Sequence, residues 1–166
     1  MSGYSKRASN ASHKSGKAEL VLDLPTVNKM LPLVQRIVAD LIAAEGELGP
    51  LLWEREGLER NRRTLDWPER QRRYQVDEDV RTVEKRRKAL AAELEGLGVA
   101  VIDAVHGRVG FPTIVNGKAA FFSWEPGETE IGYWHFQSDE RRRPVPPSWL
   151  QGQGAAASAP AKKRRG

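Results

Sequence analysis

The sequence predicts an α+β protein, in which a long antiparallel hairpin of two helices packs on a small antiparallel β-meander. Two observations lead to this fold class. Apolar residues alternate at spacings of three and four from Leu24 to Leu52 and again from Val76 to Leu97, a coiled-coil-like pattern typical of paired helices. After Val99 the pattern changes to short apolar and β-branched runs, and Asn116-Gly117 between two of them is a strong signal for a hairpin turn.

The first helix is predicted to begin at Asp23, a residue type that caps helix N-termini, with Pro25 in the first turn where its missing N–H costs little. Its apolar seam consists of Leu24, Val27, Leu31, Val34, Val38, Leu41, Leu48 and Leu52. Glu45 is the one polar interruption of this seam. Gly46 and Gly49-Pro50 weaken the helix, and the pattern leaves open whether it bends or breaks there.

Residues 53–65 are highly charged, and we expect them to form a frayed extension of the first helix. The second helix is predicted to begin at Asp66, which is followed by a proline and a glutamate in the first turn. Its seam consists of Val76, Val80, Val83, Leu90, Leu94 and Leu97, with Arg87 as a polar member. Gly96 and Gly98 are expected to end this helix, and two such helices joined by a polar turn make an antiparallel hairpin.

Four strands are predicted after the helices, and together they form the meander. They are Val99–Asp103, Arg108–Thr113, Lys118–Trp124 and Glu130–Phe136. Pro112 indicates a sheet edge or a bulge, because proline lacks the N–H that a central strand uses. The chain beyond the fourth strand is rich in arginine and proline, and we expect an extended segment there that wraps the domain.

A chain of 166 residues has the length of one domain. We expect this domain at 19–149, with the helical hairpin at 23–97, the meander at 99–136 and the extended segment at 137–149. Residues 1–18 and 150–166 contain too few apolar residues to offset the entropy of ordering, so both are predicted to be disordered basic tails.

The charge of the chain is divided unevenly. Its net charge is +5, yet the two tails hold eight of the 27 basic residues and no acidic residue. The predicted domain therefore holds 19 basic and 22 acidic residues, and the high isoelectric point does not indicate a basic face on the fold. The absence of cysteine excludes disulfides and thiolate chemistry. Because no apolar run has the length of a membrane helix and the start lacks a secretory leader, a cytoplasmic protein without membrane partners is expected.

Several short motifs follow one another in a specific order. They are Leu22–Pro32 at the first helix start, Leu97-Gly98-Val99, Phe111-Pro112, Trp124 with Gly127-Glu128, Trp134-His135 and Arg142-Arg143-Pro144. From Leu22 to Val145 this order resembles a bacterial family known as domain-of-unknown-function family 2203. The resemblance implies the fold and no activity.

The chain departs from that family pattern at two positions. Gly110 stands where the family often has Asp before Phe-Pro, and Ser123 stands where it often has Cys before Trp. If those two family residues serve a metal or redox role, this protein lacks it.

Glu128 and His135 are the strongest candidates for a site. With Asp103 and His106 they supply the carboxylates and imidazoles of a metal site or of an acid–base pair. Their spacing matches no established metal motif, and no cofactor is expected. The alternative is structural, with Glu128 capping a turn and His135 lying half-buried in the sheet and bonded to the backbone. The sequence favours this structural alternative.

Aromatic and basic residues supply further candidates. Trp124, Tyr133 and Trp134 suit a platform for stacked bases, or else they hold the sheet to the helices, and alternation along a strand places one of the last two in the core. The tails can contact phosphates through Lys14, Lys17, Lys162, Lys163, Arg164 and Arg165. The basic clusters of the hairpin are interpreted as a solvated face with ion pairs, with phosphate binding as the alternative. These clusters are Arg60, Arg62 and Arg63, then Arg70, Arg72 and Arg73, and then 85–88.

Three hypotheses for function follow. The first is a non-enzymatic module for interaction with a partner or for self-association. It rests on the hairpin, since a helix over most of 24–63 is roughly 60 Å long at about 1.5 Å per residue and outruns a small sheet. The second is weak, non-specific nucleic-acid binding through the tails. The third is an uncharacterised enzyme or metal-binding protein that uses Glu128 and His135, and the sequence gives no enzymatic signature to support it.

Overall fold

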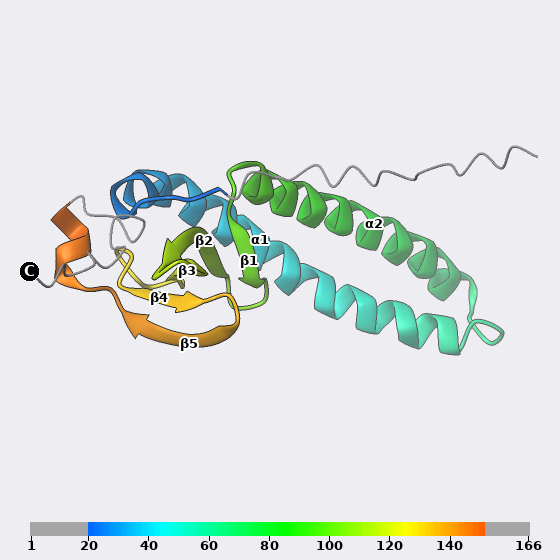
Figure 1. The fold of residues 1–166 in the computed structure, drawn as a ribbon. Helices are drawn as coiled ribbons and strands as arrows, with labels where there is room; N and C mark the ends of the chain where they lie inside the picture. Colours follow the sequence, from blue (N-terminus) through cyan, green and yellow to red (C-terminus); the bar gives the residue numbers. More distant parts are fainter. Residues whose placement is uncertain (1–19, 152–166) are drawn as a thin grey trace, which may run out of the picture.

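Residues 20–151 are described by a computed structural model, which confirms the predicted α+β fold class (Figure 1). Helix α1 (Leu24–Arg60) and helix α2 (Trp67–Gly96) pack side by side as a hairpin. A five-stranded antiparallel sheet follows, with the strands in chain order. The sheet lies against the first half of α1, and the other half of the hairpin projects beyond it (Figure 1). We call this projecting part, residues 44–90, the arm.

The ends of both helices follow from local capping. The Asp23 carboxylate accepts a hydrogen bond from the Thr26 N–H at 2.8 Å. Asp66 and Glu69 form a reciprocal capping box, in which each carboxylate accepts the backbone N–H of the other at 2.9 Å. Helix α2 ends at Gly96, and two residues later the chain turns away at Gly98, whose φ of +79° is the left-handed conformation that glycine adopts without a Cβ penalty.

Helix α1 is continuous through Gly49-Pro50, so it does not break there. The expectation of a frayed extension is wrong for most of that segment, because the helix remains regular as far as Arg60. Pro50 has no N–H to donate to the carbonyl of Gly46, but both residues are exposed, and water can bond that carbonyl instead. One helix of 37 residues therefore spans both the sheet and the arm.

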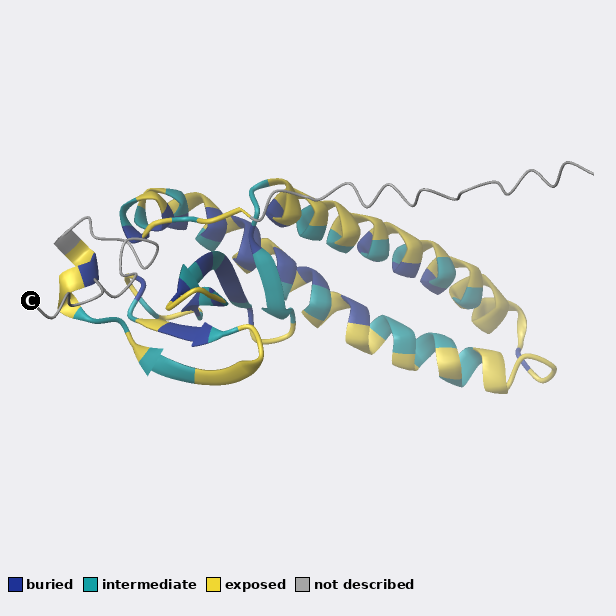
Figure 2. Ribbon diagram, viewed as in Figure 1, coloured by how far each residue is buried: buried dark blue, intermediate teal, exposed yellow. Residues whose placement is uncertain are grey.

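The hairpin takes part in two apolar cores. Buried residues are dark blue in Figure 2. The sheet core combines the first half of α1 with the inner side of the sheet and the end of α2. The arm core lies only between the two helices and consists of Ala44, Leu48, Val76, Val80 and Val83. The seam of the arm is thus filled within one chain.

Four ion pairs link α1 to α2 on the flanks of the arm core. They are Glu45–Arg87 at 3.3 Å, Glu47–Arg86 at 2.8 Å, Glu54–Arg72 at 2.6 Å and Glu59–Arg73 at 2.9 Å. The first of them joins the two polar interruptions noted in the two seams. A charge in one seam therefore faces its opposite in the other, which specifies the register of the hairpin.

The sheet differs from the predicted meander at its far edge. Its strands are β1 (Ala100–Asp103), β2 (Arg108–Val115), β3 (Lys118–Trp124), β4 (Tyr133–Phe136) and β5 (Asp139–Pro144). The predicted strand 130–136 is correct only from Tyr133 onward. The segment 137–149, predicted to be extended and to wrap the domain, instead contains β5, which pairs with β4. The charged sequence of β5 has no apolar alternation, so its pairing was not visible in the pattern.

The two local signals in the meander are confirmed. Asn116 and Gly117 have φ values of +51° and +73°, as the two-residue turn between β2 and β3 requires. Pro112 lies beyond the point where β1 ends, because the pairing of β1 with β2 reaches only Gly110. The free carbonyl of Pro112 accepts the N–H of Leu22 at 2.9 Å.

A row of aromatic side chains joins the sheet to α1. Phe111, Phe122 and Trp134 are register partners across β2, β3 and β4, and all three belong to the sheet core. Trp149, in the 3-10 helix η1 (Pro147–Gln151), contacts this row, with ring centroids 6.2 Å from Phe122 and 5.6 Å from Trp134. The chain after β5 thus closes the core.

Replacing Arg87 with alanine should lower the free energy of unfolding by roughly 1–2 kcal/mol, because Glu45 would remain half-buried without its partner. The double substitution Glu45→Leu with Arg87→Leu should recover that loss by extending the apolar seam. Urea unfolding measures both. The exposed Arg81, paired with Glu78, gives the control Arg81→Ala. A loss of equal size in that control would contradict the account.

Candidate functional site

The largest polar cluster on the sheet is centred on Arg142 of β5. Its Nε donates to Ser123 Oγ at 3.0 Å, and its terminal nitrogens reach Glu128 Oε1 at 2.5 Å and Glu125 Oε2 at 3.5 Å. The guanidinium also lies 4.3 Å from the ring centroid of Tyr133. Arg142 thereby joins β5 to β3 and to the loop between β3 and β4. Because most of its donors are used, it offers little free charge to an anionic ligand.

Glu128 has the capping role that the structural alternative predicts. Its Oε1 accepts the backbone N–H of Glu125 at 3.1 Å, and its carbonyl accepts the indole N–H of Trp124 at 2.9 Å. Its other carboxylate oxygen, Oε2, is buried and has no hydrogen-bond partner among the described residues. Glu128 thus orders the turn and balances the charge of Arg142.

His135 lies in the interior, with 2% of its surface exposed. Its Nδ1 is 2.8 Å from the carbonyl of Phe136, which can only accept, so Nδ1 carries the proton. The ring packs against Phe121 at 5.6 Å between centroids, and Nε2 is buried with no partner within residues 20–151. The residue is more deeply buried than the half-buried position expected from the sequence.

Asp103 and His106 form a pair at the turn between β1 and β2. Asp103 Oδ2 lies 2.7 Å from His106 Nδ1, while Oδ1 accepts the backbone N–H groups of Val105 and His106. The hydrogen bond from the His106 side chain is the main cause that lowers the pKa of the Asp103 carboxyl. Together with Arg108 and Glu125, the pair lines a shallow cleft at the edge of the sheet.

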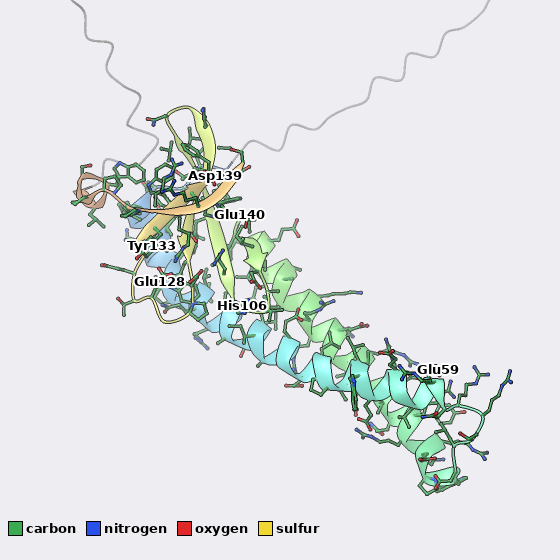
Figure 3. The ribbon with its side chains drawn as sticks, turned by 90° about the horizontal axis from the view of Figure 1, so that it is seen from below. Glu59, His106, Glu128, Tyr133, Asp139 and Glu140 are labelled. Carbon is green, nitrogen blue, oxygen red and sulfur yellow. The ribbon has the colours of Figure 1, made fainter. Side chains whose placement is uncertain are left out.

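The four predicted ligands do not come together as one group. Asp103 contacts His106, whereas Glu128 is bonded to Arg142 and His135 is buried. His106, in the turn between β1 and β2, and Glu128, in the loop between β3 and β4, are labelled in Figure 3. Within the part of the chain that the structure describes, no three His, Asp or Glu residues are placed to hold a metal ion. A link between the two regions does exist, because Glu125 pairs with both Arg108 and Arg142.

The two departures from the family pattern lie opposite each other in the sheet. Gly110 on β2 is the register partner of Ser123 on β3. The ring of Phe121 covers Gly110 so closely that a Cβ there would lie 2.8 Å from it. An aspartate at this position would therefore require Phe121 to move. In this chain the hydroxyl of Ser123 accepts from Arg142, and the phenyl ring occupies the space beside it.

The candidate aromatic residues divide between core and surface. Trp124 and Trp134 are buried at 3% and 8% exposure, while Tyr133 is 40% exposed under Arg142. Tyr133 and Trp134 point to opposite faces, as strand alternation predicts. Large exposed aromatic side chains occur instead on the arm, where Trp53, Trp67 and Tyr74 are 80%, 69% and 66% exposed.

The basic candidates of the tails lie outside the described residues. They are Lys14, Lys17, Lys162, Lys163, Arg164 and Arg165. In the arm, the interpretation of a solvated face with ion pairs holds for six of the basic residues noted in the sequence. These six are Arg60, Arg62, Arg72, Arg73, Arg86 and Arg87.

Sequence reasoning missed the centre of the polar cluster. Arg142, Ser123, Glu125 and Arg108 were not selected as site residues, although they form its contacts. The available signal was strand alternation: once 139–144 is read as a strand, Arg142 falls on the same face as Tyr133. Because residues 139–144 are mostly charged, the strand was not recognised from the sequence.

These features define a class of small α+β protein with a projecting helical arm and a sheet closed by an arginine–carboxylate cluster. No helix within residues 20–151 is long and apolar enough to cross a membrane. Residues 21–145 match a family described as an uncharacterized conserved protein, DUF2203. The chain belongs to this domain-of-unknown-function family, as the motif order indicated. No match was found among curated proteins or solved structures.

Replacing Arg142 with alanine should lower the free energy of unfolding by roughly 2–4 kcal/mol, because the largely buried Glu128 would lose its cation and Glu125 would keep only Arg108. Its neighbour Arg141 is exposed and gives a matched control, since Arg141→Ala should change stability by less than about 0.5 kcal/mol. Urea unfolding compares the two. Equal effects would mean that the cluster does not hold β5 in place.

Removing the imidazole with His106→Ala should raise the pKa of Asp103 toward its usual 3.8, because the main bond to the ionised carboxylate is lost. A lowered folded-state pKa contributes stability that is present above 3.8 and disappears as pH falls through the folded value. Titration of the Asp103 carboxyl carbon by NMR measures the change. An unaltered pKa would show that the pair does not persist in solution.

Proposed function

We propose that this protein is a non-enzymatic interaction module that engages a partner, or a second copy of itself, through the outer surface of the arm. The distribution of tryptophan carries the proposal. Trp124, Trp134 and Trp149 are buried in the sheet core at 3–8% exposure. Trp53 and Trp67 project from the arm and are largely exposed.

Exposed aromatic side chains of this kind are unusual in a surface that meets only water. Trp and Tyr bury large areas and are over-represented among the residues that dominate binding energy. The arm core is complete without Trp53, Trp67 and Tyr74, so folding of the hairpin does not account for them. The apolar seams of α1 and α2 pack against each other and are not open to another molecule. The outer surface is therefore the part of the arm that is left for binding.

The two other hypotheses have less support. Glu128 is engaged by Arg142, and His135 is enclosed in a packed interior, which leaves neither in an open site for catalysis. Binding through the tails depends on residues outside the described range. Both remain alternatives to the arm, and the same experiment separates them from it.

Photo-crosslinking tests the proposal directly in cells that produce the full chain. A photoreactive amino acid at position 53 or 67 should yield discrete adducts, either a dimer of this chain or a complex with one other molecule. The exposed Thr129, on the loop beside the sheet, is the control and should yield none. Adducts at Thr129 alone, or none at all, would overturn the proposal.

Loss of binding must be distinguished from loss of folding. Trp53→Ala and Trp67→Ala should leave the free energy of unfolding within about 0.5 kcal/mol of wild type, because both side chains are exposed. Trp124→Ala should lower it by roughly 3–5 kcal/mol, since that ring fills the sheet core. Thermal or urea unfolding measures all three. A strong destabilisation by Trp53→Ala would indicate a folding role.

A further inference from the structure

Four basic residues of the arm clusters are not balanced by a carboxylate. Arg63, Arg70, Lys85 and Lys88 are exposed and make no ion pair with a described residue. Arg70 donates from Nε to the carbonyl of Leu65 at 3.1 Å, which orients its guanidinium but leaves its charge uncompensated. The basic clusters therefore contain two groups of residues. One group forms ion pairs with glutamate, and the other is available to bind an anion.

Three of these four residues, Arg70, Lys85 and Lys88, share one side of α2 with two aromatic rings. Trp67, Arg70 and Tyr74 follow at spacings of three and four, which places them on one helical face. That face is opposite the side that Val76 and Val80 turn toward α1. Trp67 and Tyr74 are seven residues apart, or about 10.5 Å along the axis at about 1.5 Å per residue.

Lys85 and Lys88 continue the same face toward the sheet. The acidic interruption between them and Tyr74 consists of Asp77, Glu78 and Asp79. Of these three, Glu78 pairs with Arg81 at 3.3 Å and Asp79 accepts from Gln75 at 2.8 Å. We call the surface made by Trp67, Arg70, Tyr74, Lys85 and Lys88 the basic–aromatic face of α2. It combines exposed rings with unpaired positive charge, and it belongs to the projecting arm.

We propose that the basic–aromatic face of α2 binds single-stranded nucleic acid. The rings of Trp67 and Tyr74 would stack on bases, and Arg70, Lys85 and Lys88 would contact phosphates. This inference rests on the proposed function, because it names the class of partner that the arm engages. The positive charge of this face complements the negative charge of a phosphate backbone. Binding to a protein would not require aromatic rings and unpaired cations on the same face.

A single strand fits this face better than a duplex or a membrane. In a duplex the faces of the bases are covered by their neighbours, so rings on a convex helix reach them only in unpaired strands. A membrane-binding helix needs a broad apolar face, whereas Trp67 and Tyr74 stand among charged residues. Duplex DNA and anionic vesicles are therefore negative controls.

The engaged arginines of the arm supply a matched control. Arg60 and Arg62 are exposed, but each pairs with a glutamate, Glu56 at 2.9 Å and Glu59 at 3.4 Å. The double substitution Arg60→Ala with Arg62→Ala removes as many positive charges as Lys85→Ala with Lys88→Ala. A comparison of the two double variants separates the unpaired charges of this face from the overall charge of the arm.

The test is fluorescence anisotropy of labelled oligouridine titrated with the full-length protein at two salt concentrations. Trp67→Ala should weaken binding roughly 5- to 100-fold, the range expected for loss of one stacked base. Trp67→Phe keeps a ring and should restore most of the affinity. Lys85→Ala with Lys88→Ala should weaken binding at low salt and reduce its salt dependence. Arg60→Ala with Arg62→Ala should weaken binding less than that lysine double variant does.

The outcomes that overturn the inference are specific. They are no binding of oligouridine, equal affinity of Trp67→Ala and wild type, equal loss in the arginine and lysine double variants, or preference for duplex DNA or anionic vesicles. Because every variant keeps both tails, their contribution is the same throughout and cannot mimic a Trp67 effect. If oligouridine fails to bind while photo-crosslinking at position 67 yields a protein adduct, the nucleic-acid assignment fails and the proposed function stands.

Discussion

Helix α1 takes part in two separate cores, and the direction of the arm depends on its continuity between them. Its first half closes the sheet, and its second half closes the hairpin with α2. Gly49-Pro50 lies in the second half, within the arm, where a break would free the outer part of the arm from the rest of α1. The Gly46 carbonyl, which Pro50 cannot bond, is exposed to solvent, so the helix continues through this point. The orientation of the arm tip is therefore fixed by one continuous helix.

The elements with local signals were predictable from the sequence. Asp23 and Asp66 indicate where the two helices begin, and Asn116-Gly117 indicates the hairpin turn between β2 and β3. Strand β5 was not predictable in this way, because its stability comes from distant partners. Arg142 reaches Ser123 on β3, and Arg143 covers the rings of Trp134 and Phe136. A charged strand held by cation–π and ion-pair contacts has no period of its own to detect.

The site residues show the same division between local and distant information. The capping role of Glu128 follows from its place after Pro126-Gly127, and the sequence favoured it. That Arg142 would meet Glu128 depended on the missed strand. On the arm, composition indicated ion pairs, but only the helix faces separate engaged arginines from Arg70 and Lys85. The basic clusters are visible in the sequence. Which of their residues form ion pairs depends on how the two helices are placed against each other.

The central claim is that the arm is a rigid projection whose filled seam leaves its outer faces for binding. Spin labels at Arg62, near the tip, and at Lys118, at the far end of the sheet, test it most directly by pulsed dipolar spectroscopy. The chain has no cysteine, so two single substitutions give an unambiguous label pair. The account predicts one narrow distance distribution. A broad or two-peaked distribution would show that the arm takes more than one orientation relative to the sheet and would contradict the claim.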